Sequence, residues 1–251
     1  MMALEAFIRS GRRLAASSAA AAAVTLALAL LWSDPAEAAA DRVSFRTEDG
    51  VTIAATWYEP GARAAPAVIL IHMLNKSRRD WEPVASRLVA EGIGALAIDL
   101  RGHGDSTGSV DASDYSTLVR DVSAARRYLA SRGDVQQTRV GIAGASIGAN
   151  LAVLEAAGDT TVASLALLSP SLDYRGLRIE AAAVKYGARP VLLVASDDDP
   201  YAARSVRDLQ KAGRGTREAV VLSHAGHGTV MLARDQDLAR TLVDWFRRTL
   251  L

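Results

Sequence analysis

One serine in this 251-residue chain lies in a segment whose spacing suits nucleophilic chemistry. The segment Gly144-Ala145-Ser146-Ile147-Gly148 has the pattern G-x-S-x-G, and it joins an apolar run to a stretch with helical spacing. A serine at a sharp turn between a strand and a helix presents its hydroxyl above the sheet, and the flanking glycines let the neighbouring backbone pass. The backbone N–H of Ile147 would then lie at a helix N-terminus, where it can stabilise an oxyanion.

A serine nucleophile needs a base, and the base needs a carboxylate to orient it. Two of the four histidines, His224 and His227, follow the last apolar run, and three adjacent aspartates, 197–199, follow the run before it. Loops at the carboxyl ends of parallel strands meet at one rim of a sheet, where Ser146 is also expected. The order along the chain is therefore serine, aspartate, histidine, as this type of turn requires.

Each of these assignments has an alternative. We favour His227 as the base because it lies on a glycine-flanked loop that can turn inward, whereas His224 lies directly at the end of a strand. Three adjacent carboxylates diverge in direction and rarely chelate one ion. We therefore expect one functional aspartate with two solvated neighbours.

Composition narrows the possible functions. Lys and Arg number 29 and Asp and Glu number 28, so the net charge is +1, and half of the residues are hydrophobic. This balance excludes a disordered chain and argues against a nucleic-acid-binding protein, which needs a basic excess. The chain has no cysteine, which excludes a disulfide, a zinc-thiolate site and a cysteine nucleophile. No phosphate-binding, dinucleotide-binding or zinc-protease motif is present, so we expect neither a cofactor nor a metal.

The elements that must position these residues follow from apolar spacing. Short apolar runs predict strands that are buried on both faces of a parallel sheet. They cover residues 66–72, 95–99, 140–144, 165–168, 191–195 and 219–222. Helical spacing falls between several of them, at 81–89, 118–129, 149–157 and 238–246. Two earlier runs, 43–46 and 51–58, flank a turn and predict a hairpin at one edge. The fold class is therefore α/β, with a mostly parallel sheet covered by helices on both faces.

The sequence resembles the α/β-hydrolase superfamily over nearly all of its length after residue 40. Beyond G-x-S-x-G, segment 99–106 resembles the family's D-x-R-G-x-G-x-S motif, and His227-Gly228 resembles its catalytic histidine with a small residue after it. Segment 196–200 resembles the family's G-x-x-D-P segment, which selects Asp199 as the acid; Asp198 is the alternative. Small dienelactone-hydrolase-like and esterase-like members are the most similar.

The resemblance also implies where the second oxyanion donor lies. Ile71-His72-Met73-Leu74 is similar to the family's H-G-x segment, which supplies a backbone N–H, here from Leu74. Met73 stands where the family usually has glycine, so Met73 is the alternative donor, and we expect a bulkier cleft floor. His72 and His103 are interpreted as structural residues that brace their loops.

The expected activity is hydrolysis of small carboxylic esters through an acyl-enzyme. The alternatives are a peptidase or thioesterase with the same groups, or a binding protein that kept the fold without catalysis. About twenty residues, Ser169 to Arg189, separate two of the predicted strands where this superfamily often has a lid, and they can hold one short helix. We therefore expect an open site without a lid domain.

Residues 1–40 have the pattern of an export signal. Basic residues precede an uncharged stretch rich in alanine and leucine, 14–33, and small-residue cleavage sites lie after Ala38 and Ala40. These are the parts of a secretory signal peptide, so we expect a periplasmic or secreted hydrolase domain over residues 41–251. The alternative is a retained membrane anchor, because the uncharged stretch is just long enough to span a bilayer.

Overall fold

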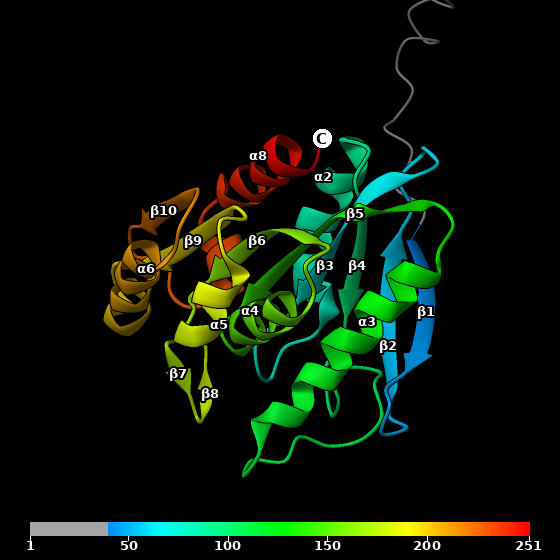
Figure 1. Ribbon diagram of the computed structural model, residues 1–251, viewed down its shortest axis with the longest axis horizontal. Coiled ribbons are helices and arrows are strands. Elements are labelled where there is room, and N and C mark those ends of the chain that lie inside the picture. The colour runs from blue at the N-terminus through cyan, green and yellow to red at the C-terminus, as the bar shows by residue number, and fades with distance from the viewer. Residues whose placement is uncertain (1–39) are drawn as a thin grey trace, which may run out of the picture. The chain divides into compact units, whose positions relative to one another are not determined.

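An eight-stranded sheet runs through residues 40–251, the part of the chain that the computed structural model describes (Figure 1). The strands lie in the order β1-β2-β4-β3-β5-β6-β9-β10. β2 runs antiparallel to both of its neighbours, and all the other pairs are parallel. The predicted edge hairpin and mostly parallel sheet are therefore confirmed. The bounds are β1 (Ala40–Arg46), β2 (Thr52–Tyr58), β3 (Ala65–Ile71), β4 (Gly94–Ile98), β5 (Val135–Ala145), β6 (Val162–Leu168), β9 (Val191–Ser196) and β10 (Arg217–Leu222).

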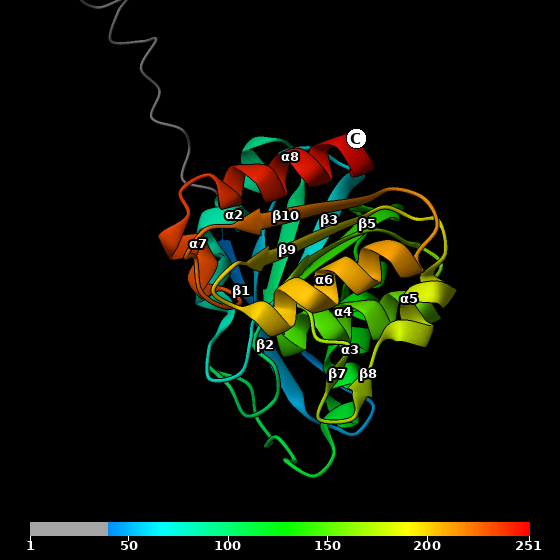
Figure 2. The ribbon, with the colours of Figure 1, turned by 90° about the vertical axis from the view of Figure 1, so that its left-hand side faces the viewer.

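Helices cover both faces of this sheet (Figure 2). One face packs against α2 (Glu82–Ala90) and α8 (Leu238–Leu250), and the other packs against α3 (Val119–Ser131), α4 (Ile147–Gly158) and α6 (Pro200–Ala212). Short helices complete the chain: η1 (Arg78–Trp81), η2 (Tyr115–Leu118), α5 (Glu180–Tyr186) and α7 (Val230–Arg234). The four helices predicted from spacing are present, and α6 is an addition to them.

The central strands are buried on both faces, as their continuous apolar runs predicted. In β3, Ala67, Ile69 and Ile71 belong to the core under α3 and α4, whereas Val68 and Leu70 belong to the core under α2 and α8. Successive side chains of a strand point to opposite faces, so one run of residues fills two cores. The carboxyl ends of these strands, where the catalytic candidates lie, are therefore packed against helices on both faces of the sheet.

The segment between β6 and β9 contains more structure than the one short helix that we expected. It forms a small hairpin, β7 (Asp173–Tyr174) and β8 (Leu177–Arg178), before α5. The buried side chain of Asn150, on α4, fixes this hairpin, because its Nδ2 donates to the carbonyl oxygens of Ser171 and Leu177 at 2.8 and 2.9 Å. The described chain has no lid domain here, which agrees with the prediction.

The predicted signal peptide and the alternative anchor, residues 14–33, lie outside the described residues. Within residues 40–251, no helix combines the length and the apolar character that crossing a membrane requires. The first strand begins at Ala40, one residue before the predicted start of the hydrolase domain.

Candidate active site

Ser146 occupies a strained turn between β5 and α4. Its backbone angles are φ 54° and ψ −119°, in a region that costs about 1–3 kcal/mol for a residue other than glycine. A Cβ at Gly148 would lie 2.6 Å from the carbonyl oxygen of Ile71, and a Cβ at Gly144 would collide with the carbonyl oxygen of Gly148. Both glycines of the motif are therefore required by close backbone approach, and the strand-turn-helix context that the motif predicted is confirmed.

The three residues selected from the sequence meet in one chain of hydrogen bonds. His227 Nε2 lies 2.8 Å from Ser146 Oγ, and His227 Nδ1 lies 2.5 Å from Asp199 Oδ2. A carboxylate can only accept, so Nδ1 carries the proton and Nε2 is free to accept the serine proton. The side chain of His227 is 46% exposed, which places this chain of groups at an open surface.

Asp199 owes its position to α6. Its Oδ1 accepts the backbone N–H of Ala202 at 3.1 Å and so caps the helix, while Oδ2 holds His227. Pro200 follows at the first helical position, where its missing N–H costs nothing. The Asp-Pro pair is a sequence signal for the start of α6. Apolar spacing did not predict this helix, because alanines make up much of its buried face.

The other two aspartates of the run are exposed, but they are not merely solvated neighbours. Asp197 Oδ1 accepts the backbone N–H of His224 at 2.7 Å, and Asp198 Oδ1 accepts that of Gly226 at 3.0 Å. These N–H groups help to hold the pKa of each carboxyl below its ordinary value, and for Asp198 the Ser196 hydroxyl has the largest effect. Both aspartates are solvated, as expected, and in addition they bind backbone N–H groups of the opposite loop, which a sequence does not show.

The two alternatives lie outside the hydrogen-bond chain. The side chain of His224 is 86% exposed, and its Nδ1 lies 3.8 Å from Asp197 Oδ1. Asp198 binds the backbone of the loop 223–229, which carries His227 and which we call the histidine loop, rather than the His227 ring. The geometry therefore favours His227 and Asp199 over His224 and Asp198.

Two serines that sequence reasoning did not assign to the site support the histidine loop. Ser169, at the end of β6, has φ 47°, and its Oγ accepts the backbone N–H of Gly228 at 3.0 Å. Ser196 Oγ accepts the backbone N–H of Ala225 at 2.8 Å. Ser169 follows β6 and Ser196 ends β9, so both lie at the same rim as Ser146. This placement was the one sequence signal that could have assigned them to the site.

The loop after β3, residues 72–77, is fixed by His72 as predicted. This side chain is fully buried; its Nε2 accepts the N–H of Leu100 at 3.0 Å, and Nδ1 donates to the carbonyl oxygen of Met73 at 2.7 Å. Burial lowers the pKa of His72 to about 4, so the ring is neutral at pH 7. His103 also braces its own loop, since its Nδ1 lies 3.0 Å from the carbonyl oxygen of Arg101.

The predicted oxyanion donors are available. Among the hydrogen bonds within residues 40–251, none uses the backbone N–H of Ile147, Leu74 or Met73. The Met73 side chain packs against Gly228 in the histidine loop. A Cβ at Gly228 would lie only 2.5 Å from Met73 Sδ, so a larger residue would collide with it. The bulk that replaces the usual glycine is therefore accommodated by a glycine in the opposite loop.

The segment that resembles D-x-R-G-x-G-x-S holds the 72–77 loop from behind. Buried Asp99 forms an ion pair with Arg78, and its Oδ1 accepts the backbone N–H of Arg78 at 2.7 Å. Its Oδ2 accepts the backbone N–H of Asp105 at 2.9 Å. Charge-assisted bonds in a buried site are strong and directional, so this segment has a structural role, which is to position the loop.

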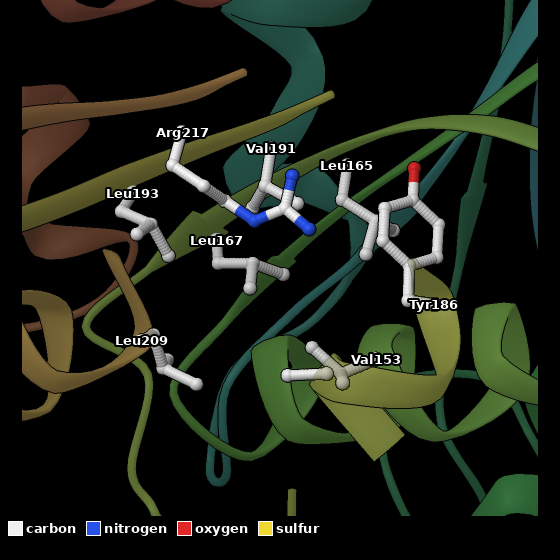
Figure 3. Close-up of a pocket in the computed structure, with 9 residues that line it drawn as sticks. Val153, Leu165, Leu167, Tyr186, Val191, Leu193, Leu209 and Arg217 are labelled. Carbon is white, nitrogen blue, oxygen red and sulfur yellow. The ribbon is translucent and has the colours of Figure 1, made fainter. Parts of the chain in front are cut away.

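A groove opens beside the 72–77 loop. It encloses about 570 Å³ and is lined by Leu74 and Asn75, by the loop 102–112, by Tyr115, and by the β7–β8 turn. We call it the hairpin groove. A second cavity, of about 10 Å³, lies among apolar core side chains such as Leu165, Leu167 and Tyr186 (Figure 3). That volume holds one water molecule at most, so it is a packing void.

Solved structures share this fold. The esterase Pf2001 of Pyrococcus furiosus superposes with a TM-score of 0.73 at 19% identity, over 85% of this chain and 94% of that one. The dienelactone hydrolase of Anabaena variabilis superposes with a TM-score of 0.72 at 21% identity, over 86% of this chain and all of that one. Both comparisons establish the α/β-hydrolase fold.

Curated relatives match shorter stretches. The quorum-quenching protein AidA of Acinetobacter baumannii is 33% identical over 134 residues, 52% of this chain and 44% of its own length. The bifunctional esterase/perhydrolase DCH of Acinetobacter calcoaceticus is 36% identical over 89 residues, 36% of this chain and 32% of its own length. The chain thus spans less than half of either relative.

A family model covers just over half of the chain. Residues 62–189 match the model described as serine aminopeptidase, S33. The match includes the 72–77 loop and the turn at Ser146, and it ends before Asp199 and His227. With the α/β-hydrolase fold already established, the chain belongs to the serine aminopeptidase S33 family of α/β hydrolases.

Proposed function

We propose that this protein hydrolyses carboxylic esters with Ser146 as nucleophile. The observation that carries the proposal is the continuous chain of hydrogen bonds from Ser146 through His227 to Asp199. Ser146 Oγ attacks the acyl carbon while His227 Nε2 takes its proton. The same nitrogen returns the proton to the leaving alcohol and then activates the water that releases the acyl group. Asp199 keeps Nδ1 protonated and stabilises the imidazolium.

The developing oxyanion is bound by backbone N–H groups. Ile147 N–H, in the first turn of α4, is one donor, and Leu74 or Met73 in the 72–77 loop supplies the other. Donors of this type are effective because they are fixed before the charge develops, and removing one costs about a hundredfold to a thousandfold in kcat. The buried contacts of His72 and Asp99 support this role, since they hold the loop from behind.

Two considerations favour esters over peptides. The DCH relative and two of the similar solved structures carry the word esterase in their names. An aminopeptidase must also hold the substrate's α-ammonium group, yet among residues 40–251 the lining of the hairpin groove includes an arginine and neither Asp nor Glu. A peptidase and a thioesterase would use the same three catalytic groups as an esterase. The residues that line the groove must therefore distinguish these activities.

A substrate panel tests this proposal. We expect p-nitrophenyl esters to be hydrolysed, with kcat/KM highest from acetyl to butyryl and low turnover of aminoacyl p-nitroanilides and acyl thioesters. A buried methylene is worth about 0.8 kcal/mol, but an open cleft leaves the later carbons of a long chain in water. A maximum at long chains, or a jump in rate when the ester forms droplets, would show that the segment between β6 and β9 covers the site. Amide or thioester turnover above ester turnover would replace the proposed activity.

The matched variant for this panel is Ser146→Ala. We expect it to lose ester turnover while it keeps the fold, because alanine removes only the hydroxyl. A binding protein with no catalytic role would show no turnover in the wild type either. Hydrolysis that persists undiminished in Ser146→Ala would exclude Ser146 as the nucleophile.

We also propose that the protein is exported, on the basis of the pattern in residues 1–40 alone. We expect the mature N-terminus between Ala39 and Asp41 when the protein is isolated from its native host and sequenced. A cytosolic protein that begins at the first methionine would contradict export. Full-length chain recovered in membranes would support the retained anchor instead.

A further inference from the structure

The hairpin groove is placed to hold part of a substrate. Its lining includes Leu74, one of the expected oxyanion donors, and the turn of the β7–β8 hairpin. The groove, of about 570 Å³, therefore adjoins the loop that we expect to bind a substrate's carbonyl, while Ser146 and His227 lie outside its described lining. The side chains that line the groove decide which substrates gain from that space.

Arg175, at the tip of the hairpin, is the charged side chain in the described lining of the groove. Its Nη1 donates to Tyr115 Oη at 3.0 Å. Its guanidinium carbon lies 5.7 Å from the ring centroid of Tyr115 and 5.9 Å from that of Tyr174. The rings of Tyr115 and Tyr174 pack edge to face, with their centroids 5.9 Å apart. These contacts hold the guanidinium over an aromatic wall and use one of its five N–H donors.

Arg175 has no carboxylate partner among residues 40–251, and this separates it from its neighbour. Arg178, on the same hairpin, is paired with Asp173 at 2.9 Å. Neither an aspartate nor a glutamate from the described chain lines the groove, whereas His103 does. The groove therefore presents an uncompensated positive charge that is held in place.

The hairpin that carries Arg175 is anchored to the helix that begins at Ser146. Buried Asn150 uses both Nδ2 hydrogens on the hairpin, and its Oδ1 accepts the backbone N–H of Ser171 at 3.1 Å. Arg175 itself has φ 48° and Gly176 has φ 92°, the left-handed angles of a tight hairpin turn. Such a turn favours Asn, Asp or Gly at its first central position, so the geometry of the turn does not explain the arginine at position 175.

We propose that the hairpin groove is a subsite for esters that carry a carboxylate, and that Arg175 binds that carboxylate. The inference rests on the proposed ester hydrolysis, because the groove adjoins the 72–77 loop that is expected to bind the oxyanion. A guanidinium binds a carboxylate through two parallel N–H···O bonds, which fixes orientation as well as charge. The expected substrates are half-esters of short dicarboxylic acids or acyl esters of short hydroxy acids.

Matched pairs of substrates test this proposal. The charged members are the monoethyl esters of glutaric, adipic and pimelic acid, and the neutral members are the ethyl esters of unbranched acids with equal carbon number. A second set of acetylated hydroxy acids and their methyl esters places the carboxylate on the alcohol side. We expect the wild type to prefer the charged member in at least one set, and we expect molar salt to shrink the preference, since a partly exposed pair is screened.

The variants are Arg175→Gln, Arg175→Lys and the control Arg178→Gln. We expect Arg175→Gln to lower the ratio of charged to neutral kcat/KM by about tenfold, the size of one good charge-assisted contact. Arg175→Lys should keep part of the ratio, because it keeps the charge but loses the planar fork. Arg178→Gln, on the same hairpin but outside the groove lining, should leave the ratio unchanged.

The possible failures are distinguishable. Wild-type protein that hydrolyses neutral esters without any preference for charged ones would overturn the subsite and leave the proposed function intact. If no ester is hydrolysed, the proposed function fails, and calorimetric titration of Ser146→Ala with monoethyl adipate still reports on the subsite. Binding that weakens about tenfold on adding Arg175→Gln supports the subsite, and binding that is absent or insensitive to Arg175 overturns it.

Discussion

His227 is hydrogen-bonded to both Ser146 and Asp199, so its loss should affect turnover most strongly. We expect His227→Ala to lower kcat for a short p-nitrophenyl ester by about a millionfold, as loss of the base does in a well-studied serine hydrolase. His224→Ala is the matched control, because this exposed ring lies outside the hydrogen-bond chain and its loss should change kcat little. An active His227→Ala together with an inactive His224→Ala would show that the loop assignment is wrong.

Asp198 binds the backbone of the histidine loop rather than the His227 ring, so we expect its contribution to kcat to be smaller. Asp198→Ala removes the acceptor for the N–H of Gly226, so we expect kcat to fall by about threefold to tenfold with little change in KM. Asp198→Asn keeps an acceptor oxygen and should recover most of that loss. Asp244→Ala, which breaks an exposed pair on α8, is the surface control. Equal kcat for Asp198→Ala and wild type would remove Asp198 from the positioning groups.

Among single residues, the sequence indicated the catalytic candidates better than the groups that support them. Ser146, Asp199 and His227 stand in recognisable local patterns, and the structure brings them together. Ser169 and Asn150 form their contacts with segments that are distant in sequence, and no local pattern encodes such contacts. The uncompensated charge of Arg175 was hidden for the same reason.

The turn between β5 and α4 is constrained by close backbone approach at both of its glycines. We expect Gly148→Ala to lower the free energy of unfolding by about 3 kcal/mol or more, because the new methyl group would press on the backbone carbonyls of Ile71 and His72. Gly158→Ala, at the other end of α4, meets nothing within 4 Å and should be neutral or slightly stabilising. Urea unfolding of both variants measures the difference. Equal stability of the two variants would show that the close approach is not rigid.

The β1–β2 turn is tied to the loop after β4 through Asp49, and this contact should respond to pH. Its carboxylate binds Arg101 at 2.7 Å and Arg120 at 3.1 Å, and the Arg101 bond holds the pKa of Asp49 well below its ordinary value. Because the pKa is lower in the folded chain than in the unfolded chain, the ionised group stabilises the fold above about pH 4. That stabilisation is lost as the pH falls through the folded pKa.

We therefore expect Asp49→Asn to lower the free energy of unfolding by about 1–2 kcal/mol at pH 7, a value reduced by solvent screening at this partly exposed site. Denaturation at a series of pH values should show the gap between variant and wild type closing below about pH 4. A gap that stays constant down to pH 2 would contradict the ionic origin of the contact.

Elements were predicted well where burial imposes a pattern. The strands of the sheet have continuous or alternating apolar runs that a short segment reveals. The β7–β8 hairpin has strands of two residues each, too short for any period, and its Arg175-Gly176 turn lacks the usual Asn or Asp. The hairpin that forms the wall of the groove was therefore beyond the reach of sequence reasoning.

At the scale of the whole molecule, the fold class followed from alternating strand and helix patterns, but the strand order did not. A buried apolar run has the same pattern whichever strand it pairs with, so the position of β4 between β2 and β3 came from the structure alone. The location of the site is less ambiguous, because all the catalytic candidates follow strands at one rim.

Covalent labelling of the serine shows whether Ser146 is a nucleophile that His227 activates. The protein is treated with a limiting fluorophosphonate, residual ester turnover is followed, and the modified residue is mapped by mass spectrometry. The account predicts that label accumulates on Ser146, that turnover is lost in proportion to it, and that His227→Ala labels far more slowly. Full turnover after Ser146 is completely labelled, or label on another residue as activity disappears, would contradict it.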